Sequence, residues 1–176
     1  SNIGWMAWAK DGEEAGTTGF GRSVEAVQIR LVKKGDAAPS SDGANVDYAF
    51  KKKPMSLTYR AHVSNVGWQG AVSDGATAGT TGRGLALEDL KLSIDSSDYS
   101  DGSAVQIDAH VSGIGWQGWD TPSASEGGTT GQGRAVEAVR LRLTGSLAKD
   151  YDVYYRVHAS NIGWMAWAKD GEEAGT

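Results

Sequence analysis

The sequence predicts an all-β protein with pseudo-threefold symmetry, and three observations lead to this fold class. A tryptophan-containing block recurs along the 176 residues. Copies of this block carry segments in which apolar and polar side chains alternate, which is the period of a half-buried strand. Three copies also contain the turn-forming sequence Gly-Thr-Thr-Gly. We therefore expect short antiparallel strands and little helix.

The repeats are marked by four anchoring tryptophans, Trp5, Trp68, Trp116 and Trp164, which lie 63, 48 and 48 residues apart. The first interval is longer because of an inserted segment, at about residues 32–54, that is typical of a surface loop. Repeats 1, 2 and 3 then cover residues 1–63, 64–111 and 112–159. Residues 160–176 open a fourth repeat and are identical to residues 1–17.

A lone repeat of about 48 residues would bury little core, so we expect residues 1–159 to form one domain. An alternating first strand is predicted before each of the last three anchoring tryptophans, at residues 57–63, 105–111 and 153–159. The anchoring tryptophan follows on a returning strand, which makes a hairpin. A longer third strand comes after the Gly-Thr-Thr-Gly turn. Its apolar side comprises Val27, Ile29 and Leu31 in repeat 1, and then Leu90, Leu92, Ile94, Val139, Leu141 and Leu143.

Three such units around a shared core favour a β-prism of three small sheets, in which each repeat contributes one sheet. A β-trefoil has the same symmetry and stays open as the alternative.

The composition excludes several classes of function. A formal net charge of -5 disfavours nucleic acid, which rewards clustered Lys and Arg. The chain has no cysteine, so disulfides and zinc-thiolate sites are ruled out. No run approaches 18 apolar residues, and the first residues lack the pattern of a secretory leader. We expect a soluble chain without membrane insertion and without a cofactor.

The repeats resemble a known family. Tyr-Arg-Ala-His-Val-Ser-Asn-Val-Gly-Trp-Gln-Gly at residues 59–70, followed by Asp-Gly, Gly-Thr-Thr-Gly and a Glu-containing strand, is similar to the clostridial hydrophobic repeat with a conserved tryptophan, the ChW family. The resemblance implies a non-enzymatic module of secreted or cell-surface proteins of Gram-positive bacteria. It further implies adhesion or anchoring through glycan or protein ligands. Two departures are Ala71, where other copies have a second tryptophan, and residues 121–126 in place of the Asp-Gly loop.

The two tryptophans of a copy are three residues apart, so on a regular strand they would face opposite sides. We expect the anchoring tryptophans to pack in the core, because an indole buries a large apolar area. The second tryptophan is then the candidate for a glycan or protein ligand, with packing between repeats as the alternative. Neighbouring glutamines could supply hydrogen bonds. The candidate ligand-binding residues are Trp8, Trp119, Trp167, Gln69 and Gln117.

Metal binding has weak support. The three histidines, His62, His110 and His158, share one repeat position, and threefold symmetry could bring them around one axis. Structural hydrogen bonding by each histidine is the favoured interpretation, so no metal site is predicted. The acidic residues of the loops lack the ligand spacing of a calcium site: Asp11, Glu13, Glu14 and Asp74.

Catalysis also has weak support. The Gly-Thr-Thr-Gly-x-Gly sequence precedes no helix and no Lys-Ser/Thr pair, so turn formation is favoured over phosphate binding. No set of nucleophile, base and orienting group stands out. The recurrent glutamates occupy equivalent positions and look structural: Glu25, Glu88 and Glu137. We expect no enzyme activity.

The identical ends support a second hypothesis, a structural module that self-assembles into a fibre or array. The copy at residues 160–168 has its first strand but lacks a third, whereas the copy at 3–9 has a third but lacks a first. Such ends could complement each other between molecules. A longer polypeptide repeating every 159 residues is the alternative. The candidate self-association residues are Ile3, Trp5, Trp8, Ile162, Trp164 and Trp167.

Overall fold

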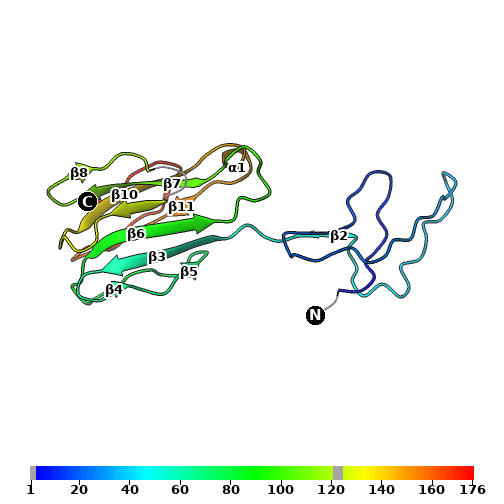
Figure 1. The fold of residues 1–176 in the computed structure, drawn as a ribbon, viewed down its shortest axis with the longest axis horizontal. Coiled ribbons are helices and arrows are strands. Elements are labelled where there is room, and N and C mark those ends of the chain that lie inside the picture. The colour runs from blue at the N-terminus through cyan, green and yellow to red at the C-terminus, as the bar shows by residue number, and fades with distance from the viewer. Residues whose placement is uncertain (1–2, 121–124) are drawn as a thin grey trace. The chain divides into compact units, whose positions relative to one another are not determined.

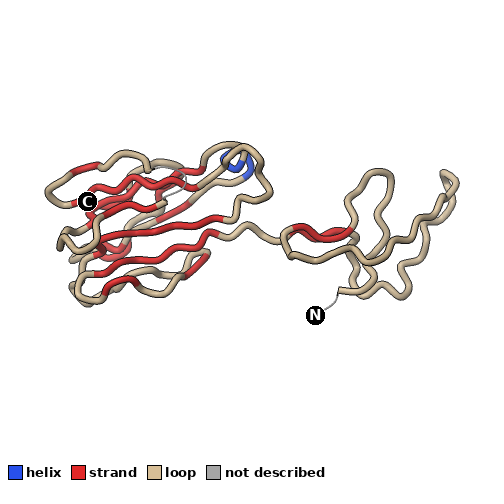
Figure 2. Tube along the Cα trace, viewed as in Figure 1, coloured by secondary structure: helices blue, strands red, loops and turns tan. Residues whose placement is uncertain are grey.

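The computed structural model describes residues 3–120 and 125–176, and it divides into two compact units (Figure 1). Unit 1 is Ser1–Pro54 and unit 2 is Met55–Thr176. Strands and loops make up nearly all of both, as Figure 2 shows, and α1 (Leu147–Asp150) is the only helix of the described residues. The all-β expectation is confirmed. The choice between prism and trefoil, and the domain predicted over residues 1–159, stay predictions.

Two equivalent sheets form around Trp68 and Trp116 in unit 2. The first contains β3 (Leu57–Val63), at the end of repeat 1, with β4 (Gly67–Trp68), β5 (Val72–Ser73) and β6 (Leu87–Ile94) of repeat 2. The second contains β7 (Val105–Val111), at the end of repeat 2, with β8 (Gly115–Trp116) and β10 (Val136–Leu143) of repeat 3, which also contributes β9 (Glu126–Gly128). In each sheet the first strand lies between the returning and third strands, giving the antiparallel orders β4-β3-β6 and β8-β7-β10. These predicted strands are therefore confirmed.

A third hairpin follows in unit 2, although its strands are shorter. The first-strand segment contains β11 (Tyr154–Tyr155) and β12 (His158–Ala159). The returning segment contains β13 (Gly163–Trp164) and β14 (Ala168–Lys169). β11 pairs with β14 and β12 with β13, both antiparallel. Unit 2 thus holds three first strands but only two third strands among the residues that the structure describes.

The hydrophobic core of unit 2 is built by the alternation that the sequence predicts. Ala61, Val63, Ile107 and Ala109 are fully or almost fully buried, whereas His62 and His110 on the same strands point away. Side chains from all three hairpins meet in one cluster. Its members include Leu92, Val105, Val111, Val139, Leu141, Val153, Tyr155, Ala168 and Ala174.

Consecutive repeats are joined through the outer edge of each third strand. β9 pairs with β6, placing Gly128 opposite Asp89. β15 (Ala174–Gly175) pairs with β10 in the same way, placing Gly175 opposite Ala138. A Cβ atom on either glycine would lie within 2.4 Å of a main-chain oxygen of the third strand. This close approach, together with a φ near +140°, explains why the turn sequence has glycine there.

Unit 1 is mostly loop (Figure 2). Its strands are β1 (Gly16–Thr18) and β2 (Phe50–Lys52), which pair in parallel, so part of the inserted segment is a strand. Val27, Ile29 and Leu31 form no strand and are 73%, 87% and 99% exposed. The half-buried strand predicted for them is wrong for this unit, because no described strand of unit 1 pairs with the segment.

The inserted segment takes the place of a first strand in unit 1. The amide of Ala7 donates to the Tyr48 carbonyl over 3.2 Å, and that of Gly16 donates to Ala49 over 2.8 Å. Asn45 exchanges two hydrogen bonds with the main chain of Trp5. The main-chain groups of residues 3–17 therefore have different hydrogen-bond partners from those of residues 162–176, although the two sequences are identical.

Asp89 of β6 gives a testable prediction about stability. Its side chain is buried, and its Oδ1 atom has no hydrogen-bond partner. Burial, reinforced by the nearby Glu126, raises the pKa of Asp89 from 3.8 to about 6. The folded state therefore favours the protonated form, so this group's contribution to stability is present below about pH 4. It is lost as the pH rises through about 6.

Asp89→Asn is expected to raise the unfolding free energy at pH 7 by up to about 3 kcal/mol and to flatten its pH dependence between pH 4 and 6. Urea titrations at several pH values measure both effects. The matched control is Asp108→Asn in the buried β7 position, where Oδ1 accepts a hydrogen bond from the Gly118 amide over 2.9 Å. That variant should lose about 1 kcal/mol. A fall in the unfolding free energy of Asp89→Asn equal to that of Asp108→Asn would contradict the prediction.

Candidate functional site

Each hairpin of unit 2 carries a histidine and an indole in direct contact. His62 lies opposite Trp68, His110 opposite Trp116 and His158 opposite Trp164 in the strand registers. In all three pairs the ring centroids are 5.4 Å apart, and the rings meet edge to face. The arrangement is therefore a property of the repeat and not of one copy.

An arginine completes the arrangement by lying over each indole. Arg60 lies 4.6 Å from the ring centroid of Trp68, and Arg156 lies 4.8 Å from that of Trp164. Over Trp116 the guanidinium is that of Arg140, at 3.9 Å. Arg140 comes from the third strand and not from the first. The first-strand position equivalent to Arg60 is Asp108, whose carboxylate lies 3.8 Å from the Arg140 guanidinium. Two strand positions thus supply the same cation-π contact.

These indoles lie on the outer face of the sheets, so the expected core packing of the anchoring tryptophans is wrong. Trp164 and its counterpart in unit 1, Trp5, are each 45% exposed. The register explains the error. Residues opposite each other on neighbouring strands share a face, and His62 alternates with buried Ala61 and Val63. The sequence signal that could have placed the tryptophan on the outer face is the polar histidine six residues before it, which lies opposite it in the hairpin.

The two tryptophans of a hairpin share that outer face, which corrects the expectation that they face opposite sides. Arg156 lies within 4.8 Å of the Trp164 ring centroid and 4.6 Å of the Trp167 centroid. The expectation assumed a regular strand between the two rings. The returning segment is instead interrupted, because β13 ends at Trp164 and β14 begins at Ala168.

The three candidate ligand-binding tryptophans have different surroundings. Trp8 is partly buried and donates from Nε1 to the Ser40 carbonyl over 3.0 Å. Trp119 is partly buried and lies under Arg142, whose Cζ is 4.1 Å from the ring centroid. Trp167 is 54% exposed. Trp167 is therefore the most accessible of the three.

The two candidate glutamines hydrogen-bond to the main chain of their own repeat. Gln69 Oε1 accepts from the Gly79 amide over 2.8 Å. Gln117 makes two such bonds with Gly128, accepting over 2.9 Å and donating over 3.0 Å. Both side chains hold the Gly-Thr-Thr-Gly turn against the hairpin.

The histidines stay in their separate sheets. His62 Nδ1 lies 3.0 Å from Glu88, and His110 Nδ1 lies 3.0 Å from Glu137. Within residues 3–120 and 125–176, no group of three or more His, Cys, Asp or Glu side chains is arranged to hold a metal ion.

The Asp-Gly loops have a structural contact. Asp74 Oδ1 accepts from the Leu57 amide over 3.0 Å, and Asp170 Oδ1 accepts from Val153 over 2.9 Å. Each loop thereby fixes the start of a first strand. In repeat 3, Ser125 Oγ donates to the Val105 carbonyl at the matching place. Most of the divergent loop at residues 121–126 lies outside the described residues.

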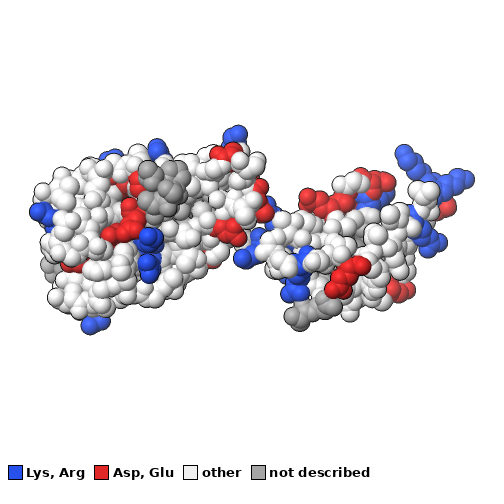
Figure 3. Space-filling model, viewed as in Figure 1, with Lys and Arg blue, Asp and Glu red and all other residues white. Residues whose placement is uncertain are grey.

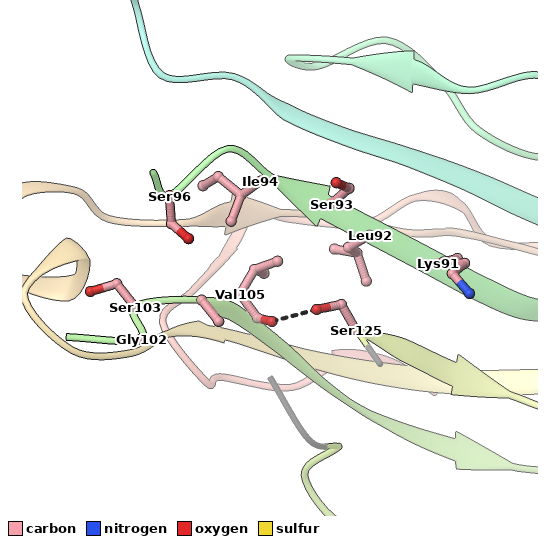
Figure 4. Close-up of a pocket in the computed structure, with 10 residues that line it drawn as sticks. Lys91, Leu92, Ser93, Ile94, Ser96, Gly102, Ser103, Val105 and Ser125 are labelled. Atoms are coloured by element: carbon pink, nitrogen blue, oxygen red, sulfur yellow. Dashed lines mark hydrogen bonds between the residues drawn. The ribbon is translucent and has the colours of Figure 1, made fainter. Parts of the chain in front are cut away.

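A pocket of about 480 Å³ opens beside β6 and β7, with several serines around it (Figure 4). Its lining includes Ser93, Ser96, Ser103 and Ser125, and no candidate ligand-binding residue. Acidic and basic side chains are interspersed on the visible face of each unit (Figure 3). No described helix is long and apolar enough to cross a membrane.

The candidate self-association residues are partly accessible. Ile162 is 62% exposed in unit 2, where Trp164 and Trp167 are also exposed. Ile3 and Trp8 of unit 1 are partly buried, and Trp5 is exposed.

Arg60→Met removes the guanidinium over Trp68 but keeps an apolar stem of similar length. We expect the unfolding free energy to fall by about 0.5–1 kcal/mol, because the cation-π contact is lost at a partly exposed site. Chemical denaturation followed by tryptophan fluorescence measures the change. Arg83→Met, at an exposed position in the turn of the same repeat, is the control and should have no measurable effect. A similar fall in unfolding free energy in both variants would show that the effect comes from the loss of a surface charge and not from the contact with Trp68.

One protein family model matches the chain in four segments. The model of the family described as "Clostridial hydrophobic W" (ChW) matches residues 1–33, 62–95, 110–145 and 158–176. Each of the first three segments reaches the end of a third strand, or, in unit 1, its sequence equivalent. No curated protein and no solved structure matches the chain. The four segments cover well over half of the sequence and contain every His-Trp pair described above, so the chain belongs to the clostridial hydrophobic W family of repeat modules.

Proposed function

We propose that this chain is a non-enzymatic module, outside the cell or on its surface, that binds glycans through the outer face of its hairpins. The observation that carries the proposal is the exposed pair Trp164 and Trp167 with Arg156 over both rings. The role is adhesion or anchoring.

The chemistry of this face suits a sugar. An indole is a flat apolar surface against which the C–H face of a pyranose can pack. A guanidinium held beside it donates several hydrogen bonds in a fixed plane, which suits hydroxyl or carboxylate groups of the sugar. Because Arg156 is already positioned by both rings, little side-chain entropy is lost when a ligand binds.

The hairpin of Trp116 also carries two tryptophans under arginines, and the hairpin of Trp68 carries one, so several weak sites per chain would act together on a polymeric glycan. The family assignment supports a repeat module, and the net charge of -5 argues against a nucleic acid ligand. A protein on the cell surface is the competing ligand class, since exposed aromatic and arginine side chains also dominate protein interfaces.

Trp167→Ala tests the proposal with little risk to the fold, because repeat 2 has Ala71 at this position. We expect retention on arrays of bacterial cell-wall and host glycans to fall about tenfold or more, as for loss of an aromatic anchor. Thermal unfolding of the same variant should be nearly unchanged. Array fluorescence and affinity electrophoresis measure the first effect.

Trp119→Ala is the matched variant. Its ring is partly buried under Arg142, so we expect a clear loss of stability with a smaller loss of glycan retention. Retention of a surface protein, but of no glycan, by the wild-type chain would favour the competing ligand class. Unchanged glycan retention in Trp167→Ala would rule out the proposed face.

A second candidate function, self-association into a fibre or array, is favoured by a different observation. The apolar side of residues 27–31 is almost wholly exposed in unit 1. A long exposed segment of alternating apolar residues is a template for pairing with another strand.

A further inference from the structure

The outer face of the first sheet of unit 2 carries two opposed cations. Arg60 of β3 lies directly opposite Lys91 of β6. The equivalent positions of the second sheet hold Asp108 and Arg140, whose charged groups are 3.8 Å apart. Like charges on directly opposite residues repel, whereas opposite charges attract. The first sheet therefore has an unfavourable pair where the second sheet has a favourable one.

Arg60 is the member of this pair that lacks a polar partner. Lys91 Nζ lies 2.8 Å from Glu126, so its charge is compensated. Arg140 of the second sheet, which also lies over an indole, contacts two carboxylates. Within residues 3–120 and 125–176, the Arg60 guanidinium has no hydrogen bond and no ion pair, and it lies 4.6 Å from the Trp68 ring centroid. Its donors are therefore available to an anion.

Three larger side chains of the second sheet are replaced by short ones in the first sheet. Arg142 Cζ lies 4.1 Å from the Trp119 ring centroid, and Arg142 Nε donates to Gln106 over 2.9 Å. The equivalent residues of the first sheet are Ala71, Ser93 and Thr58. Ala71 and Ser93 are exposed. The first sheet thus presents methyl and hydroxyl groups where the second has an indole, a guanidinium and an amide.

Ala71 leaves room beside Arg60. The third hairpin shows the place of a second tryptophan, because the Trp167 ring lies 4.6 Å from Arg156, the equivalent of Arg60. Ala71 is the equivalent of Trp167, and its methyl group cannot cover a guanidinium as an indole does. A ring from a ligand can therefore take the place that the second indole has in the third hairpin.

We propose that four residues of the first sheet bind one acidic sugar residue of a glycan. This Arg60 site consists of Arg60, Ala71, Ser93 and Thr58. The pyranose ring lies over Ala71, and its carboxylate or phosphate group contacts the Arg60 guanidinium. The inference rests on the proposed function, glycan binding. It adds a class of glycan and a site distinct from the exposed tryptophan pair of the third hairpin.

The chemistry of the Arg60 site favours an acidic sugar over a neutral one. A planar guanidinium binds a carboxylate or phosphate through two parallel hydrogen bonds, whereas a sugar hydroxyl offers a single oxygen. The Thr58 and Ser93 hydroxyls can bond to hydroxyls of the ring. An anion beside Arg60 also offsets its repulsion by Lys91. Because the chain has a net charge of -5, a preference for acidic glycans requires such a local arrangement.

Two probes of equal length test the role of charge. Pentagalacturonate carries a carboxylate on each ring, and its methyl ester keeps the rings without the charge. In calorimetric titrations of the full chain, we expect a dissociation constant at least about fivefold lower for the acid than for the ester, as for one charge-assisted contact. Added salt should reduce this acid preference.

Arg60→Asp should abolish the acid preference. We expect the variant to fold, because the second sheet has Asp108 at this position, opposite Arg140. Arg83→Asp, at an exposed turn position, makes the same change in net charge and is the matched control. It should keep the acid preference. Loss of the preference in both variants, or in neither, overturns the proposal.

Ala71→Trp tests where the sugar ring lies. The other hairpins have tryptophan at this position, so the variant should keep the unfolding midpoint of the wild type. The added indole occupies the place proposed for the sugar ring, and we expect the affinity for pentagalacturonate to fall at least about fivefold. An unchanged or higher affinity overturns the proposal.

Competition separates the two sources of negative charge. Glucuronate and glucose 6-phosphate have the same ring with different acidic groups, and glucose has neither group. Displacement of pentagalacturonate by either acid, but not by glucose, supports the proposal and identifies the preferred group. Inorganic phosphate that displaces pentagalacturonate as well as glucose 6-phosphate does would show that the ring contributes nothing, which overturns it.

Further outcomes separate this inference from the proposed function. Failure of the proposed glycan face shows as unchanged glycan retention in Trp167→Ala. Failure of the Arg60 site shows as an acid preference that is absent from the wild-type chain or survives in Arg60→Asp. A peptide of five glutamates that binds as tightly as pentagalacturonate, with the same loss in Arg60→Asp, would assign the site to an acidic protein segment and overturn the assignment to a sugar.

Discussion

The first strand of a repeat needs a strand on each edge, and the rest of this structure depends on that requirement. A strand whose main-chain amides and carbonyls lack partners cannot be buried without a large cost in free energy. β3 and β7 meet the requirement, and they carry four of the five largest fully buried side chains, Val63, Val105, Ile107 and Val111. Among the described residues, the third hairpin pairs through the two-residue ladders β11–β14 and β12–β13.

The identical terminal segments show how strongly pairing partners override local sequence. In unit 2, the amide of Met165 donates to Val157, as the equivalent amides of repeats 2 and 3 do to their own first strands. In the described part of unit 1, Trp5, Ala7 and Gly16 instead hydrogen-bond to Asn45, Tyr48 and Ala49 of the inserted segment. The identical sequences at residues 3–17 and 162–176 thus take different secondary structure, which the local pattern alone cannot predict.

Much of the fold was nevertheless predictable. Alternation located β3, β6, β7 and β10, because these strands have one face in the core and one in solvent. Alternation gave a wrong prediction at residues 24–31, which have the pattern of a strand but pair with no described strand of unit 1. The site was harder to predict. Trp68 and Trp116 are large and apolar and suggest a core, and only the cross-strand register with His62 and His110 places them outside.

Pairing on both edges also has a mechanical consequence. β6 lies between β3 and β9, and β10 lies between β7 and β15, all antiparallel. A tensile force along such a central strand loads the hydrogen bonds of both ladders in shear, so many must break together before the strand slides. The two-residue ladders of β4 and β8 contain few such bonds and would yield first under load.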